Sequence, residues 1–180
     1  MYASVEDVPP YEWKTPLQRS IQILKRHRDV MFRENPAVAP ISMIITNLAA
    51  HAYKSERDLW AALTSIVEGM PKFVRTTRPR VPNPADPAED YADRWAKNPF
   101  LESNFWSWHT QVSADLEALA LGIEDRKVGS LVRRIFSIDL KRDELSRFEN
   151  MAPVIQVARS APAISIPYAP RPWGKSCKKP

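Results

Sequence analysis

The sequence is poor in glycine and cysteine, and each scarcity argues against a class of site. Only 4 of its 180 residues are glycines, and a phosphate-binding loop needs several glycines close together, because glycine reaches left-handed backbone conformations at little cost. The one cysteine, Cys177, has no partner for an internal disulfide, which favours a reducing compartment. With no histidine near it in the sequence, this thiol is also a poor candidate for a nucleophile.

Long apolar runs are missing too. No stretch approaches the roughly 18 apolar residues of a membrane-spanning helix. The first residues read MYASVEDVPPYEW and have neither the basic nor the apolar segment of a secretory signal. We therefore expect a cytoplasmic protein without membrane contact.

Proline and basic residues are plentiful. The chain contains 17 prolines and has a net charge of +5, with a pI of about 9.4. A basic excess favours anionic partners, but it does not choose between a nucleotide, a nucleic acid and a membrane surface. Many of the prolines fall in a connector at residues 71–87 and in residues 151–180.

Apolar periodicity predicts an all-α fold, an irregular bundle of about six helices with an extended, proline-rich C-terminal tail. The first helix should begin with a capping box between Thr15 and Gln18, with Pro16 at its first position, and end before Pro36. Ser55 is expected to cap the third helix, which Gly69 ends. Further helices are expected at about 40–53, 88–97, 101–121, 125–137 and 140–150.

Three segments follow from this pattern. Residues 1–14 are a lead-in, residues 15–150 form the helical domain, and residues 151–180 are a weakly ordered basic tail. The tail is set apart because prolines at this density cannot join a helix or a central strand.

The first helix carries four consecutive basic residues, and helical geometry divides them. Arg28 falls in the middle of the apolar face, where a guanidinium needs a carboxylate or a phosphate as partner. Lys25 lies at the edge of that face, His27 should point to a neighbouring helix, and Arg26 should point to water. A structural ion pair and a phosphate contact are both open readings of Arg28.

Two other groups of polar residues are candidate sites. Arg19, Arg26 and Arg33 recur every seven residues, as a solvated stripe or as a contact for a nucleic-acid backbone. Asp90 and Asp93 would share a helix face, where acids either support a metal ion or complement the helix dipole. The three histidines fall in three different predicted helices, so no metal site is expected from them.

Two stretches of the chain carry a family resemblance. They are TPLQRSIQILKRHRDVMFRENPAVAPISMIITNLAAHAY and VPNPADPAEDYADRW, and the likeness spans roughly residues 14–121. Both resemble the C-terminal half of bacterial nucleotidyltransferases related to cyclic GMP-AMP synthase and oligoadenylate synthetase. These enzymes, the CD-NTases, are the cyclic-oligonucleotide synthases of antiphage signalling systems.

The resemblance implies a helical lobe that closes on a nucleoside triphosphate held with Mg²⁺ by an N-terminal palm. In this lobe Lys25, within ILKRH, would bind the triphosphate, and Ser42, within PISMI, would touch phosphate or base. Arg28, one turn beyond Lys25, is a further nucleotide-binding candidate.

The sequence departs from the family at the catalytic residues. It contains no Asp-x-Asp, and nucleotidyl transfer needs carboxylates that hold two metal ions. The resemblance begins almost at Met1, so we expect the palm to be missing, as in a fragment, a truncated reading frame or half of a split enzyme. We therefore expect no catalytic residue, no bound metal and no activity in this chain alone.

Two functions follow. The favoured one is the helical nucleotide-binding lobe of a cyclic-oligonucleotide synthase in antiviral second-messenger signalling, with a nucleoside triphosphate and a palm as partners. The alternative is a non-enzymatic helical adaptor or nucleic-acid-binding module, which would use the arginine stripe and the segment RTTRPR at residues 75–80. The alternative is less favoured because few aromatic residues interleave with these basic segments.

Overall fold

A computed structural model describes residues 14–124 and 127–146, and over these ranges the predicted all-α fold is confirmed. Residues 142–146 are also helical. The β pairing found in the described part is an isolated bridge between Pro82 and Asp90. The α-helices are α1 (Pro16–Met31), α2 (Ser42–Ala52), α3 (Leu59–Gly69), α4 (Pro99–Glu124) and α5 (Val128–Phe136), joined by the 3₁₀ helices η1 (Pro36–Val38), η2 (Met70–Phe73) and η3 (Asp93–Ala96).

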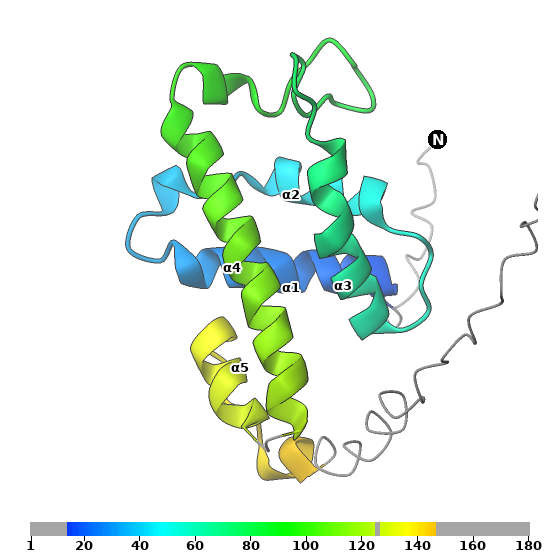
Figure 1. The fold of residues 1–180 in the computed structure, drawn as a ribbon, viewed down its shortest axis with the longest axis vertical. Helices are drawn as coiled ribbons and strands as arrows, with labels where there is room; N and C mark the ends of the chain where they lie inside the picture. Colours follow the sequence, from blue (N-terminus) through cyan, green and yellow to red (C-terminus); the bar gives the residue numbers. More distant parts are fainter. Residues whose placement is uncertain (1–13, 125–126, 147–180) are drawn as a thin grey trace, which may run out of the picture.

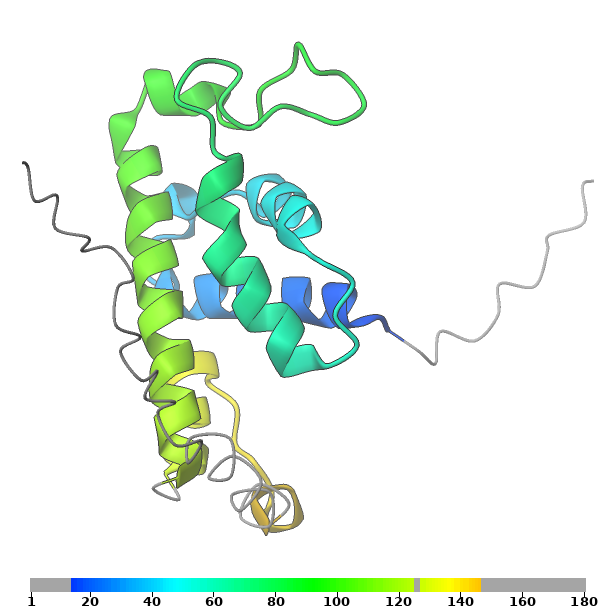
Figure 2. The same ribbon diagram turned by 45° about the vertical axis from the view of Figure 1, so that its right-hand side comes forward.

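The long helix α4 runs along the molecule, and α1 crosses it (Figure 1). Helix α1 packs against α2, α3, α4 and α5, so it is the central element of the bundle. The connection between α3 and α4 lies beyond one end of α4, and α5 packs near the other end (Figures 1 and 2). The predicted tail, residues 151–180, lies outside the described residues. No helix in the described part is both long and apolar enough to cross a membrane.

The core is built on an apolar stripe of α4. All five members of that stripe are buried: Phe105, Trp108, Val112, Leu116 and Leu119. They recur at intervals of three to four residues, which puts them on one helix face. Leu24 of α1 and Ile66 of α3 are completely buried in the same cluster. Helix α4 is therefore the support on which the other helices are positioned.

The start of α1 is as predicted, and the start of α3 is not. The side chain of Thr15 accepts a hydrogen bond from the backbone N–H of Gln18, and the reciprocal bond of the capping box is also present. Helix α3 is capped by Asp58, which accepts from the N–H of Ala61, so the expectation for Ser55 was wrong. Ser55 instead has a left-handed backbone with a φ of 65°.

The short helix expected at 88–97 is reduced to the turn η3. The cause is Asp90, whose carboxylate accepts hydrogen bonds from the backbone N–H groups of Arg80, Val81 and Ala92. These bonds fix an irregular loop in front of η3 and leave the preceding residues without helical pairing. Asp90 is thus a structural carboxylate rather than half of a metal site.

Two large apolar residues beside the core are partly exposed. Met31 of α1 is 40% exposed, and Ile41, just before α2, is 38% exposed. In the last turns of α1 the buried side chain is that of His27, which is 2% exposed. The apolar face of α1 therefore turns toward α4 through His27, and Met31 is left at the open end of the helix.

Candidate functional site

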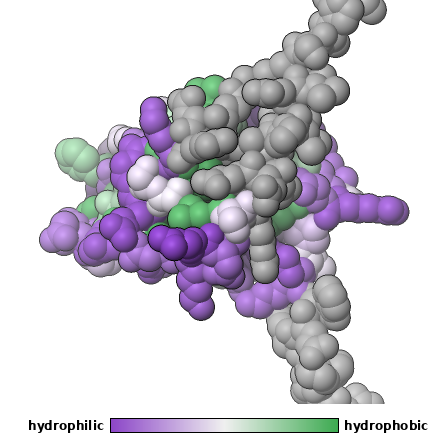
Figure 3. Space-filling model, turned by 90° about the horizontal axis from the view of Figure 1, so that it is seen from below, coloured by the Kyte–Doolittle hydropathy of each residue, from purple (hydrophilic) through white to green (hydrophobic). Residues whose placement is uncertain are grey.

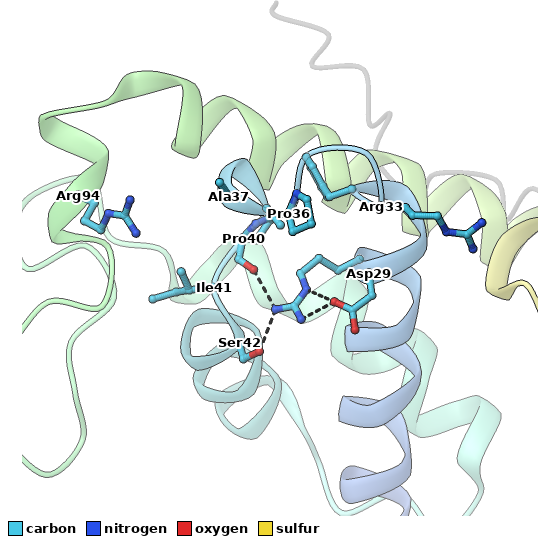
Figure 4. Close-up of a pocket in the computed structure, with 11 residues that line it drawn as sticks. Asp29, Arg33, Pro36, Ala37, Pro40, Ile41, Ser42 and Arg94 are labelled. Carbon is cyan, nitrogen blue, oxygen red and sulfur yellow. Dashed lines mark hydrogen bonds and ion pairs between the residues drawn. The ribbon is translucent and has the colours of Figure 1, made fainter.

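Arg28 joins the end of α1 to the start of α2. Its Nη1 donates to the hydroxyl oxygen of Ser42 at 2.8 Å and to the carbonyl oxygen of Pro40 at 3.1 Å. Its Nε and Nη2 donate to the carboxylate of Asp29, the next residue (Figure 4). The Arg28 side chain is 14% exposed and that of Asp29 is 55% exposed. The guanidinium therefore has the carboxylate partner that its position demanded, and that partner is open to solvent.

These residues line a pocket of about 650 Å³ between α1, η1, the start of α2 and η3, which we call the α1–α2 pocket. Its charged side chains are three arginines, Arg28, Arg33 and Arg94, and one carboxylate, Asp29. The excess of positive charge attracts anions.

The N-terminus of α2 adds a second source of positive potential. Ile41 is the N-cap of α2, and no side chain caps the first N–H groups of the helix. Unsatisfied N–H groups at a helix start carry the positive end of the helix dipole and bind phosphate and carboxylate groups. Because Pro40, Ile41 and Ser42 all line the pocket, this helix end borders it.

Lys25 lies one turn before Arg28 on α1. It is half-buried, and within the described residues it has no hydrogen-bond or ion-pair partner. It does not line the α1–α2 pocket. Of the three residues predicted to bind nucleotide, the structure brings Arg28 and Ser42 into contact and places Lys25 a turn away along the same helix.

Sequence reasoning missed Arg33 and Arg94 as members of this pocket. Arg33 follows the last turn of α1, and Arg94 comes from η3, more than sixty residues later in the chain. No local pattern marks either residue, because the pocket is assembled from segments far apart in the chain, with Arg94 coming from η3 (Figure 4).

The three arginines of the α1 stripe are exposed, as predicted, and two of them also bind the end of α5. Arg26 donates to the backbone carbonyl oxygens of Phe136 at 2.9 Å and Ser137 at 3.4 Å, and Arg33 donates to the Ser137 hydroxyl at 2.7 Å. The carbonyl groups at a helix C-terminus carry its negative end and attract cations. Arg26 and Arg33 therefore tie α1 to the end of α5 while remaining exposed, and the sequence did not predict these contacts.

His27 does point to a neighbouring helix, as predicted. Its Nε2 lies 3.0 Å from the carboxylate of Asp115 on α4. Burial lowers the pKa of His27 below its ordinary value, and the hydrogen bond and charge of Asp115 offset this only in part. The imidazole is thus a packed structural group apart from the α1–α2 pocket.

The described residues contain no group of three or more histidines, cysteines, aspartates or glutamates that could hold a metal ion. For Asp90, burial acts to raise the pKa, but hydrogen bonds from the N–H groups of Val81, Arg80 and Ala92 and the charge of Arg78 outweigh it, so its pKa lies below the ordinary value. A carboxylate already satisfied by three backbone donors is poorly suited to bind a cation.

Two curated proteins are similar in sequence to this chain. No protein-family model matches the chain. It is 32% identical over 139 residues to a c-di-GMP synthase of Roseivirga ehrenbergii, a match that covers 74% of this chain and 36% of that protein. It is 28% identical over 140 residues to the cyclic dinucleotide synthase CdnG of Bradyrhizobium diazoefficiens, covering 72% of this chain and 31% of that protein.

The fold is similar to a solved structure as well. The structure of the B. diazoefficiens CD-NTase CdnG in complex with GTP superimposes with a TM-score of 0.56 at 24% identity, covering 84% of this chain and 45% of that one. At this identity the likeness shows the fold. The matched region spans about a third of the length of the two curated relatives.

Proposed function

We propose that this chain, which is homologous to the CD-NTases over about three quarters of its length, is the nucleotide-binding helical lobe of a cyclic-oligonucleotide synthase that makes an antiviral second messenger. The observation that carries the proposal is the meeting of Arg28, Ser42 and the uncapped start of α2 at one cationic pocket. A guanidinium, a hydroxyl and a helix N-terminus are together suited to hold the phosphates of a nucleoside triphosphate.

The hydrogen bonds already present suggest how phosphate would bind. Ser42 accepts from Arg28 through its oxygen, so its own O–H remains able to donate to a phosphate oxygen. Asp29 occupies the other edge of the guanidinium and, being exposed, can turn to water when a phosphate takes its place. Lys25 is the flexible cation of the set, and its side chain would contact the outer phosphates from one turn along α1.

The chemistry itself is assigned to a palm lobe. Nucleotidyl transfer depends on two metal ions about 3.5–4 Å apart, which stabilise the attacking and leaving oxygens. The described residues supply cationic groups for positioning and charge neutralisation, which provide most of the catalysis in phosphoryl transfer. We propose that Mg²⁺ arrives with the nucleoside triphosphate and is held by palm carboxylates. Product formation from mixed nucleoside triphosphates, with and without a candidate palm, tests whether catalysis requires the palm.

Binding by the chain itself is tested by calorimetric titration with MgATP and MgGTP. We expect weak binding that falls about tenfold or more in Arg28→Ala, in line with the loss of a charge-assisted hydrogen bond, and less in Lys25→Ala and Ser42→Ala. Arg19→Ala is the matched control, because Arg19 is exposed on α1 and does not line the pocket. Its affinity should equal that of the parent.

Because Arg28 also binds the Pro40 carbonyl, Arg28→Ala could perturb the α1–α2 turn. Arg28→Lys keeps the charge and loses the fork of donors, so it should bind more weakly than the parent at an unchanged melting temperature. A parent chain that binds neither nucleotide, or an Arg28→Ala chain with the parent's affinity, would contradict the proposal.

The alternative of a nucleic-acid-binding module or adaptor draws less support from the structure. Arg26 and Arg33 are engaged with the end of α5, which leaves Arg19 and the exposed arginines Arg75 and Arg78. Binding through these residues would show as a duplex mobility shift with a steep salt dependence. We expect no such shift at low salt.

A further inference from the structure

A second pocket, on the other side of α1, is almost entirely apolar. This pocket, the α5 groove, has a volume of about 650 Å³ and lies between α1, α3, α4 and α5. Leu63 of α3, Leu116 of α4 and Val132 of α5 contribute to its walls. Trp60 and Ile138 also line it and are 38% and 45% exposed. Seen from the end of the molecule where α5 lies, hydrophobic side chains reach the surface among hydrophilic ones (Figure 3).

The apolar walls of this groove would be more stable if they were covered. Apolar grooves on folded proteins are recurring binding sites for chain segments. Nothing in the nucleotide-binding proposal uses this groove, because the α1–α2 pocket is lined by different side chains of α1.

The described part of the chain ends beside the groove. The side chain of Leu145 packs against Gly129, reaching within 2.9 Å of where a Cβ would lie. Gly129 follows Val128, which lines the groove. The chain therefore passes Ser146, the last described residue, close to the start of α5, where Val128 lines the groove.

The sequence that follows has the composition of an occupant. Residues 151–157 read MAPVIQV and are apolar except for one glutamine. They begin five residues beyond Ser146, and an extended chain advances about 3.3–3.6 Å per residue, so they can start up to about 17 Å from Ser146. In an extended segment Pro153, Ile155 and Val157 share one face. Glu149 precedes the segment, and the groove is bordered by Arg19, whose charge has no partner among the described residues.

We propose that residues 151–157 bind in the α5 groove as an extended segment and cover the apolar walls formed by α3, α4 and α5. The proposal is independent of nucleotide binding. It assigns this groove to a segment of the chain itself rather than to a second copy or to another protein.

Hydrogen–deuterium exchange on the full chain tests this assignment. Ile155→Asp/Val157→Asp places two charges on the buried face of the segment, and Ile164→Asp/Ile166→Asp is the matched control in the same tail. The first variant should raise exchange at least threefold in peptides from α3 and α5 and increase the fluorescence of an apolar dye several-fold. The control should leave both readouts at the level of the parent.

The groove side provides the reciprocal measurement. Val132→Asp should speed exchange in the peptide that contains residues 151–157, with far-UV circular dichroism reporting whether the helices persist. If Val132→Asp fails to fold, the tail variants still decide the question, because both substitutions lie outside the described helices. Equal exchange and dye binding in parent, variant and control would overturn the proposal and leave the groove open to another chain, and an equal rise in variant and control would overturn it too.

Discussion

The buried contact between α1 and α4 leads to a quantitative prediction for Asp115→Ala. The Asp115 carboxylate is 10% exposed and has two partners. One oxygen lies 3.0 Å from Nε2 of the buried His27, and the other lies 3.3 Å from Nη2 of Arg134, whose side chain is 60% exposed. The substitution removes both contacts and leaves the imidazole without a partner, since its Nδ1 already has none in the described part of the chain.

The two contacts should contribute very differently. A buried hydrogen bond to a charged group contributes about 1.5–3 kcal/mol, and leaving a buried polar group unpaired costs about 1–3 kcal/mol. An exposed ion pair contributes about 0–1 kcal/mol. We therefore expect Asp115→Ala to lower the free energy of unfolding by about 2–4 kcal/mol, and Arg134→Ala by less than about 1 kcal/mol.

Urea unfolding near neutral pH, followed by far-UV circular dichroism, measures both variants. Arg134→Ala is the control because it removes only the exposed partner of the same carboxylate. Equal losses of stability in the two variants would contradict a stabilising role for the buried contact between His27 and Asp115.

Three further predictions concern the fold. Asp90→Asn replaces the carboxylate that accepts three backbone N–H groups and should cost about 1–3 kcal/mol in urea unfolding; a neutral result would remove Asp90 as the organiser of its loop. Gly69→Ala would place a Cβ 2.9 Å from the Cβ of Ala52 and should lower the free energy of unfolding by about 1–3 kcal/mol through overpacking. An unchanged melting temperature would mean that α2 and α3 can move apart enough to fit the extra methyl group at no cost in stability. Because burial lowers the pKa of His27 below 6.5, the unfolded chain takes up this proton first, so stability should fall as the pH drops below about 6.5. His27→Gln should reduce that slope, and a slope equal to the parent's would exclude His27 as its source.

Local sequence signals predicted the elements that depend on local interactions. The capping box that starts α1 rests on contacts between residues three positions apart, and the apolar stripe of α4 is visible in the sequence as a spacing of three to four residues. Ser55 failed as a cap because Asp58, three residues later, offers an equally good acceptor, and only the packed position of α3 decides between them. Residues 88–97 failed as a helix because Asp90 bonds to N–H groups of a separate segment, Arg80 and Val81.

At the candidate site, too, the residues marked by the sequence were predicted and those placed by tertiary packing were missed. Arg28 was marked by its place on an apolar face, and Ser42 came from the family resemblance, so their contact at 2.8 Å brings together two predicted residues. Arg94 was missed because it reaches the pocket only through the packing of η3. The engagement of Arg26 with the end of α5 was missed for the same reason, since its partner lies 110 positions away in the sequence.

A crystal structure of this chain grown with GTP and Mg²⁺ would show directly whether the α1–α2 pocket binds the triphosphate. We expect phosphate oxygens within hydrogen-bond distance of the Arg28 guanidinium and the Ser42 hydroxyl, at the start of α2. A triphosphate bound elsewhere, such as on the arginines of residues 75–80, with the Arg28–Ser42 contact closed and unoccupied, would contradict this expectation.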